Sequence, residues 1–169
     1  MLKEFAQGRC LRKNASGVPT GIVPLRRVAS AAVIIDVEDT GFDDCKNSVL
    51  SYFRGKGIKA DVFFLDFRRL AKGERLITPI STTILRRNLN WYGKPSRASA
   101  KTLLSLEPDL LVCLVPERTF TAEYLASATR ARFKAGRFQS PVFDMVYRAD
   151  GVSQDFAFLE ICKLLEKIS

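Results

Sequence analysis

The side chains best suited to chemistry in this sequence are cations and flat aromatic rings that lie close together between residues 68 and 101. Guanidinium groups bind phosphate oxygens through paired hydrogen bonds, aromatic rings stack on unpaired bases, and amides recognise base edges. We therefore expect this segment to contact the phosphates and bases of RNA. The candidate residues are Arg68, Arg69, Lys72, Arg75, Arg86, Arg87, Asn90, Trp91, Tyr92, Lys94, Arg97 and Lys101.

A second group of cations lies in the first 30 residues, which hold six basic residues and one acidic residue. Gly17, Pro19, Gly21 and Pro24 interrupt regular structure there. We expect residues 1–30 to form a basic N-terminal arm that binds phosphate or docks on a protein partner, and we expect a chain without residues 1–24 to fold. The candidate phosphate-binding residues of the arm are Lys3, Arg9, Arg12 and Lys13.

The distribution of charge supports a nucleic-acid partner. The chain of 169 residues has 27 Lys and Arg against 18 Asp and Glu, a net charge of +9. Residues 51–100 alone hold eleven basic and three acidic residues. Clustered cations of this kind favour a non-enzymatic RNA-binding or ribosome-associated module. The alternative is a solvated basic surface without a ligand, because no RRM, KH or helix-turn-helix motif accompanies the cations.

Trp91 is the residue that separates these two interpretations. Its neighbours Asn88, Asn90, Gly93 and Lys94 are polar or small, so we expect the indole to be partly exposed and available for stacking. In the alternative, the ring closes the rim of the hydrophobic core and the flanking amides accept its N–H.

A different class of function is indicated by carboxylates at the ends of two predicted strands. Asp36, Asp39 and Asp66 lie where doubly wound sheets bind ligands, and such a cluster suits Mg²⁺. With Arg118 at a later strand end, they would make a small enzyme or a protein that binds a nucleotide or phosphate ligand. The simpler interpretation of the same residues is a solvated loop before a helix, and it is the one that we favour. No glycine-rich phosphate loop is present in the sequence.

Several chemistries are disfavoured by composition. The chain has no histidine, which excludes Ser-His and Cys-His nucleophile pairs. Its four cysteines are far apart and form no C-x-x-C pair, so we expect no metal or other cofactor and a location in the reducing cytoplasm. No apolar run approaches the roughly 18 residues that span a bilayer, so we expect no membrane association.

The elements that must position these residues alternate between strands and helices. Apolar runs at 31–37, 61–67 and 109–116 predict buried strands, 81–85 a short strand, and 141–150 an edge or last strand, with a strand or extended turn around Gly136. Helices are expected after residue 41, at 98–106, after a Thr119 or Thr121 cap, and after a Ser153 cap. This pattern predicts one domain over residues 31–169, a three-layer Rossmann-like or flavodoxin-like α/β sandwich with about five mostly parallel strands.

Two segments carry a resemblance to a known family. Residues 88–95, Asn-Leu-Asn-Trp-Tyr-Gly-Lys-Pro, resemble an LNW(F/Y)GKP segment, and the run from Asp109 to Phe138 resembles a second segment that begins with an apolar strand. Both are similar to a family of short α/β proteins from Bacteroidota, a domain of unknown function. The resemblance spans most of residues 31–169, and no activity or catalytic residue follows from it.

Overall fold

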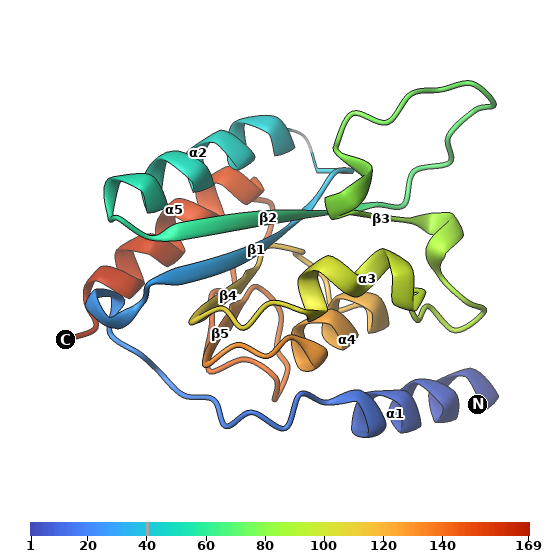
Figure 1. Ribbon diagram of the computed structural model, residues 1–169, viewed down its shortest axis with the longest axis horizontal. Coiled ribbons are helices and arrows are strands. Elements are labelled where there is room, and N and C mark those ends of the chain that lie inside the picture. Colours follow the sequence, from blue (N-terminus) through green and yellow to red (C-terminus); the bar gives the residue numbers. More distant parts are fainter. Residues whose placement is uncertain (40) are drawn as a thin grey trace.

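Six parallel strands form one open sheet in the computed structural model, which describes residues 1–39 and 41–169 (Figure 1). The strands are β1 (Ser30–Asp36), β2 (Lys59–Asp66), β3 (Thr83–Leu85), β4 (Leu110–Cys113), β5 (Phe133–Gly136) and β6 (Met145–Val146). Their order, β3-β2-β1-β4-β5-β6, is the order of dinucleotide-binding Rossmann sheets and differs from the flavodoxin order. The predicted sandwich is thus confirmed, with six strands instead of about five.

Five α-helices, besides three short 3-10 helices, accompany the sheet in the part of the chain that is described. They are α1 (Leu2–Asn14), α2 (Phe42–Gly55), α3 (Arg97–Leu104), α4 (Phe120–Ala128) and α5 (Gln154–Glu166). Both predicted caps are confirmed: the hydroxyl of Thr119 accepts a hydrogen bond from the Ala122 N–H, and that of Ser153 from the Phe156 N–H. None of the described helices has the length and apolarity needed to cross a membrane.

The two faces of the sheet bury separate hydrophobic clusters. Along β1, Val33 and Ile35 point to the face covered by α2 and α5, while Ala32 and Ile34 point to the face covered by α3 and α4. All four of these side chains are fully buried, because a central parallel strand is covered on both faces. The helix α1 lies outside α4 and adds a further layer on that face (Figure 1).

The carboxyl end of β1 is fastened to the start of α5. The side-chain amide of Gln154 donates to the Asp36 carbonyl at 2.7 Å and accepts from the Asp36 N–H at 2.7 Å. Gln154 is buried, so both of its polar atoms need these partners. The pair holds the last helix in register with the centre of the sheet.

The segment 141–150 differs from the long strand that its alternating pattern predicts. Only Met145 and Val146 pair with β5. The reason lies in Phe143, whose ring packs directly on Gly136: a Cβ atom on Gly136 would lie 2.4 Å from that ring. The chain bends through residues 140–144 to bring the ring into this place, and it joins the sheet afterwards.

The first 30 residues follow the surface of the domain. Cys10 on α1 is only 5% exposed and belongs to the cluster formed with α3 and α4. Beyond α1, the Ser16 N–H donates to the Ser127 carbonyl and the Gly21 N–H to the Arg132 carbonyl, each at 3.0 Å. The basic segment is therefore attached along its length, which determines where its cations can act.

Candidate nucleic-acid interface

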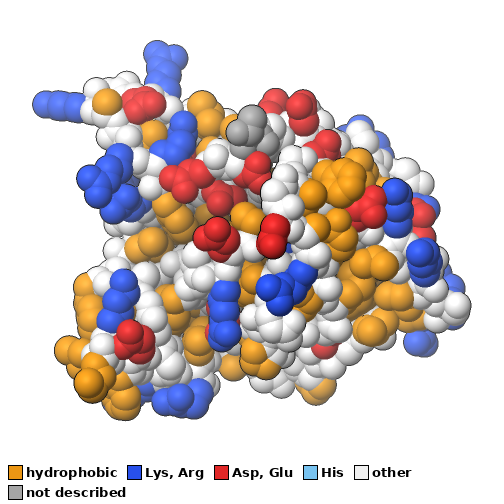
Figure 2. Space-filling model, turned by 180° about the vertical axis from the view of Figure 1, so that it is seen from behind, with side chains coloured by type: hydrophobic (Ala, Val, Ile, Leu, Met, Phe, Trp, Pro, Cys, Tyr) orange, Lys and Arg blue, Asp and Glu red, His pale blue; other side chains and the backbone are white. Residues whose placement is uncertain are grey.

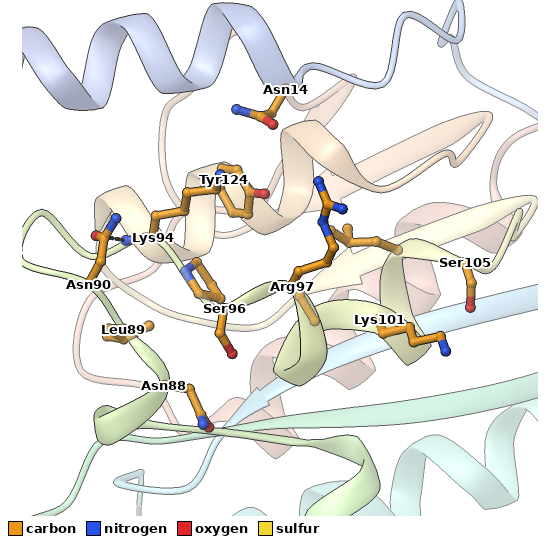
Figure 3. Close-up of a pocket in the computed structure, with 13 residues that line it drawn as sticks. Asn14, Asn88, Leu89, Asn90, Lys94, Ser96, Arg97, Lys101, Ser105 and Tyr124 are labelled. Atoms are coloured by element: carbon orange, nitrogen blue, oxygen red, sulfur yellow. Dashed lines mark hydrogen bonds between the residues drawn. The ribbon is translucent and has the colours of Figure 1, made fainter.

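A groove of about 720 Å³ opens between α3, the end of α1 and the loop that precedes α3 (Figure 3). Its cations are Lys94, Arg97 and Lys101. No carboxylate is among the described residues that line it. The Arg97 guanidinium extends from α3 toward α1, and Lys101 lies farther along α3 beside Ser105 (Figure 3). A concave surface with cations and no opposing anions attracts a polyanion.

The loop at residues 88–96 is shaped by asparagine side chains. The Oδ1 atom of Asn90 accepts from the backbone N–H of Tyr92 at 3.1 Å and of Lys94 at 2.9 Å. The Oδ1 atom of Asn88 accepts from the Leu85 N–H at 2.8 Å. Gly93 has a φ of +97°, a region that favours glycine. Asn90 was predicted to contact nucleic acid, but its side-chain oxygen already accepts two hydrogen bonds within the loop.

The two predicted stacking residues have different environments. Trp91 is 63% exposed, which confirms the expected exposure of its ring. Tyr92 is half-buried. The centroid of its ring lies 5.8 Å from that of Phe120, and its backbone carbonyl accepts a hydrogen bond of 2.8 Å from the Gln7 side chain. Trp91 stands edge-on against Tyr92 at 5.1 Å, so Tyr92 supports the ring that is free to stack.

The helix α1 lies beside the groove. Asn14, the last residue of α1, lines the groove, and Gln7 is bonded to Tyr92. Packing of α1 against α4 therefore brings the helix next to the loop at residues 88–96, although none of its cations lines the groove. The exposed cations of α1 are Lys3, Arg9, Arg12 and Lys13.

A second set of cations surrounds a hollow of about 520 Å³ at the carboxyl ends of β2 and β3. Arg69, Arg86 and Arg87 are exposed there, whereas Arg68 makes two hydrogen bonds of 2.8 Å with the carboxylate of Asp66. This pairing lowers the pKa of Asp66. Lys72 and Arg75 lie exposed in the following loop. Of the predicted phosphate ligands in this region, Arg68 is thus already engaged.

The predicted acidic cluster is not assembled into a metal site. Burial raises the pKa of Asp36, and the nearby carboxylates of Glu38, Asp39 and Asp66 raise it further. Asp66 is committed to Arg68, and the residues that the structure describes contain no group of three His, Cys, Asp or Glu arranged to hold a metal ion. On the rear face, acidic side chains gather in the upper middle, with Lys and Arg side chains to their left and below them (Figure 2).

Several residues that line the groove were missed in the sequence. Asn14, Ser96 and Tyr124 line it, and none of them is a cation. One signal was available: α4 is mostly apolar, and in the structure all residues from Thr121 to Ala126 are buried, which indicates a helix covered by a further layer. That layer is α1, and its position creates one wall of the groove.

Comparison with known proteins places the chain without assigning an activity. Residues 3–168 match the model of a family of unknown function, DUF6913. No curated protein and no solved structure matches the chain.

Proposed function

The chain belongs to the DUF6913 family, for which no function is known, and we propose that it binds single-stranded RNA in the groove between α1 and α3. The observation that carries this proposal is a groove beside α1 that holds Lys94, Arg97 and Lys101 and whose lining contains no carboxylate among the described residues. In this proposal Lys94, Arg97 and Lys101 contact phosphates, and the α1 cations extend the track.

The exposed ring of Trp91 supports a single strand over a duplex. A base in a duplex is stacked on its neighbours, whereas an unpaired base presents a free face to an indole. Duplex DNA is bound in the major groove by a projecting helix or ribbon. Here α3 has eight residues and packs with Ala100 and Leu103 buried, so it does not project.

The setting that we propose is cytoplasmic RNA or the ribosome. All four cysteines are unpaired and buried, which supports a reducing compartment. The alternative of a small ligand at the acidic loop is less favoured, because Asp66 is paired with Arg68. A protein partner at α1 is a separate alternative, since Met1, Leu2 and Phe5 are exposed.

The proposal is tested by fluorescence anisotropy with a labelled single-stranded RNA of mixed sequence. Binding is expected at about 50 mM salt and should weaken strongly by about 200 mM, because each phosphate contact releases counterions. The double variant Arg97→Ala, Lys101→Ala should reduce the slope of log K against log salt by roughly 1.4, about 0.7 for each contact.

The matched control removes two cations from the other side of the sheet. Arg54→Ala with Lys167→Ala, on α2 and just after α5, changes the net charge by the same amount. This variant should keep most of the affinity and the original slope. Absence of binding at low salt, or equal losses in the two double variants, would overturn the proposal. Sedimentation with ribosomes at low and high salt then tests the ribosomal setting.

A further inference from the structure

A buried arginine without an acidic partner lies at the carboxyl edge of the sheet. Arg137 directly follows β5 and is 4% exposed. Its Nη1 donates to the Leu114 carbonyl at 3.2 Å and its Nη2 to the Val152 carbonyl at 3.3 Å. Among the described residues, its Nε has no hydrogen-bond partner and no carboxylate lies within ion-pair distance of it, although the charge of Asp39 favours the guanidinium and the Oδ1 atom of Asp155 on α5 is likewise buried without a partner.

This arrangement is costly for a domain that has no use for it. Transfer of a charge from water into the interior is unfavourable unless the charge is paired, and a guanidinium does not lose its proton in proteins. Two of its five N–H groups are bonded to carbonyls, so three remain. An anion in contact with the guanidinium would compensate the charge and accept from donors that the carbonyls leave free.

The surroundings of Arg137 provide space for such an anion. A pocket of about 800 Å³ lies after the carboxyl ends of β4, β5 and β6, on the edge where doubly wound sheets bind ligands. Arg118 and Arg148 line it together with Arg137. Glu117 and Asp150 also line it, both exposed, while Arg118 is paired with Glu123 on α4.

The position where Rossmann sheets commonly bind a phosphate is unsuitable for an anion in this chain. That place is the N-terminus of the helix after β1. Here α2 carries Asp43 and Asp44 in its first turn, and Asp39 precedes it. These carboxylates repel phosphate. The cations of the pocket instead follow strands that lie on the other side of β1.

We propose that this pocket binds the phosphate group of a small phosphorylated molecule, with Arg137 as its buried anchor and Arg118 and Arg148 as additional contacts. The site is distinct from the groove between α1 and α3, since no lining residue is shared. It also differs from the metal-dependent alternative considered from the sequence, because it uses cations in place of Asp36, Asp39 and Asp66.

The test is a ³¹P NMR titration of the full-length protein with inorganic phosphate and with pyrophosphate at constant ionic strength. Broadening of the phosphate resonance by the wild type is expected, and Arg137→Met should weaken binding by roughly tenfold or more, since it removes a charge-assisted contact. Arg26→Met, which removes an exposed guanidinium before β1, is the matched control and should bind as the wild type does.

Folding and RNA binding are measured on the same variants. Replacement of a buried unpaired charge by an apolar side chain is expected to leave the fold intact. If Arg137→Met does not fold, Arg148→Met supplies the test, because Arg148 is exposed, and it should weaken phosphate binding severalfold. The proposed site is overturned if the wild type does not broaden the phosphate resonance, or if Arg137→Met and Arg148→Met bind phosphate as tightly as the wild type does. Competition of phosphate by RNA would assign the pocket to the RNA track and overturn a separate small-molecule site. Unchanged RNA affinity in Arg137→Met supports a small-molecule site that is separate from the RNA groove.

Discussion

The two faces of the sheet are covered in different ways. Under α2 and α5, the rings of Phe53 and Phe158 are fully buried and meet at 5.8 Å, and Tyr52 stands edge-on to both. On the opposite face, the layer of α1, α3 and α4 contains the cationic groove and also buries a lysine, Lys134. The first face has a mainly apolar interior, with Gln154 buried at its carboxyl edge, whereas the second combines an interior with polar and charged groups.

This difference indicates that the α2–α5 face contributes mainly to stability and the opposite face to binding. Interlocked aromatic rings give a large gain from burial but leave no room for a ligand. The layer with polar groups leaves a groove at its surface, where Lys94, Arg97 and Lys101 are available to phosphate, while Lys134 is buried beneath it. We therefore expect substitutions on the α2–α5 face to change unfolding and those at the groove to change RNA affinity.

The largest effect is expected from Phe158→Ala. Removal of a fully buried ring leaves a cavity and should lower the free energy of unfolding by roughly 3–5 kcal/mol. Phe156→Ala is the matched control on the same helix: that ring is 50% exposed, and its loss should cost less than about 0.5 kcal/mol. Chemical denaturation measures both. Equal costs for the two variants would contradict the division between the faces.

A pH-dependent difference is expected from Lys134 on the groove face. Its amine donates to the Ser127 carbonyl at 3.2 Å, and burial lowers its pKa from 10.5 to about 8. Between these two pH values the unfolded chain holds a proton that the folded chain has lost, so stability rises with pH. Relative to Lys134→Met, the wild type should gain on the order of 3 kcal/mol from about pH 8 to about pH 10.5.

The difference between the two proteins is the quantity to measure. Burial raises the pKa of the thiols of Cys45, Cys113 and Cys162 to about 12, so the fold loses stability as the pH rises from 9 toward 12. This loss is common to the wild type and the variant and cancels in the difference. A difference that stays constant across the range would show that the amine is solvated.

The smallest effect on stability is expected at Trp91. Because the ring is largely exposed, Trp91→Ala should change the free energy of unfolding by less than about 0.5 kcal/mol. If the ring stacks on a base, the same change should weaken RNA binding by roughly 1–3 kcal/mol. Tyr92→Ala is the contrasting variant, because its half-buried ring packs on Phe120 and its loss should lower stability. Indole emission that is blue-shifted and insensitive to RNA would count against stacking.

Local sequence signals were sufficient for much of the fold. Continuous apolar runs identified β1, β2 and β4, and hydroxyl caps at Thr119 and Ser153 marked two helix starts. Such signals arise from residues that are close together in the chain, so a single sequence is enough to reveal them. The segment 141–150 shows their limit, because contact of Phe143 with Gly136 overrides the alternating pattern.

The sites depend on contacts between distant segments, and these were harder to predict. The cations from Lys94 to Lys101 were visible as a cluster, but the groove exists only because α1 packs beside α4. Arg137 carried no signal at all. Its sequence neighbours, Gly136 and Phe138, do not distinguish a buried guanidinium from an exposed one, and its burial follows from carbonyls at Leu114 and Val152.

The outermost strands of the sheet have a consequence for the behaviour of the protein at high concentration. β3 has three residues and β6 has two, so these two strands cover little of the strands that they border. Long flat borders template the addition of strands from other molecules, and short ones do not. β1 is paired on both sides, with β2 and β4, whereas β3 pairs only with Phe64, Leu65 and Asp66 of β2. Residues 59–63 of β2 therefore form part of the border, and we expect strand addition to the folded protein to begin there, while β1 becomes available only in the unfolded chain.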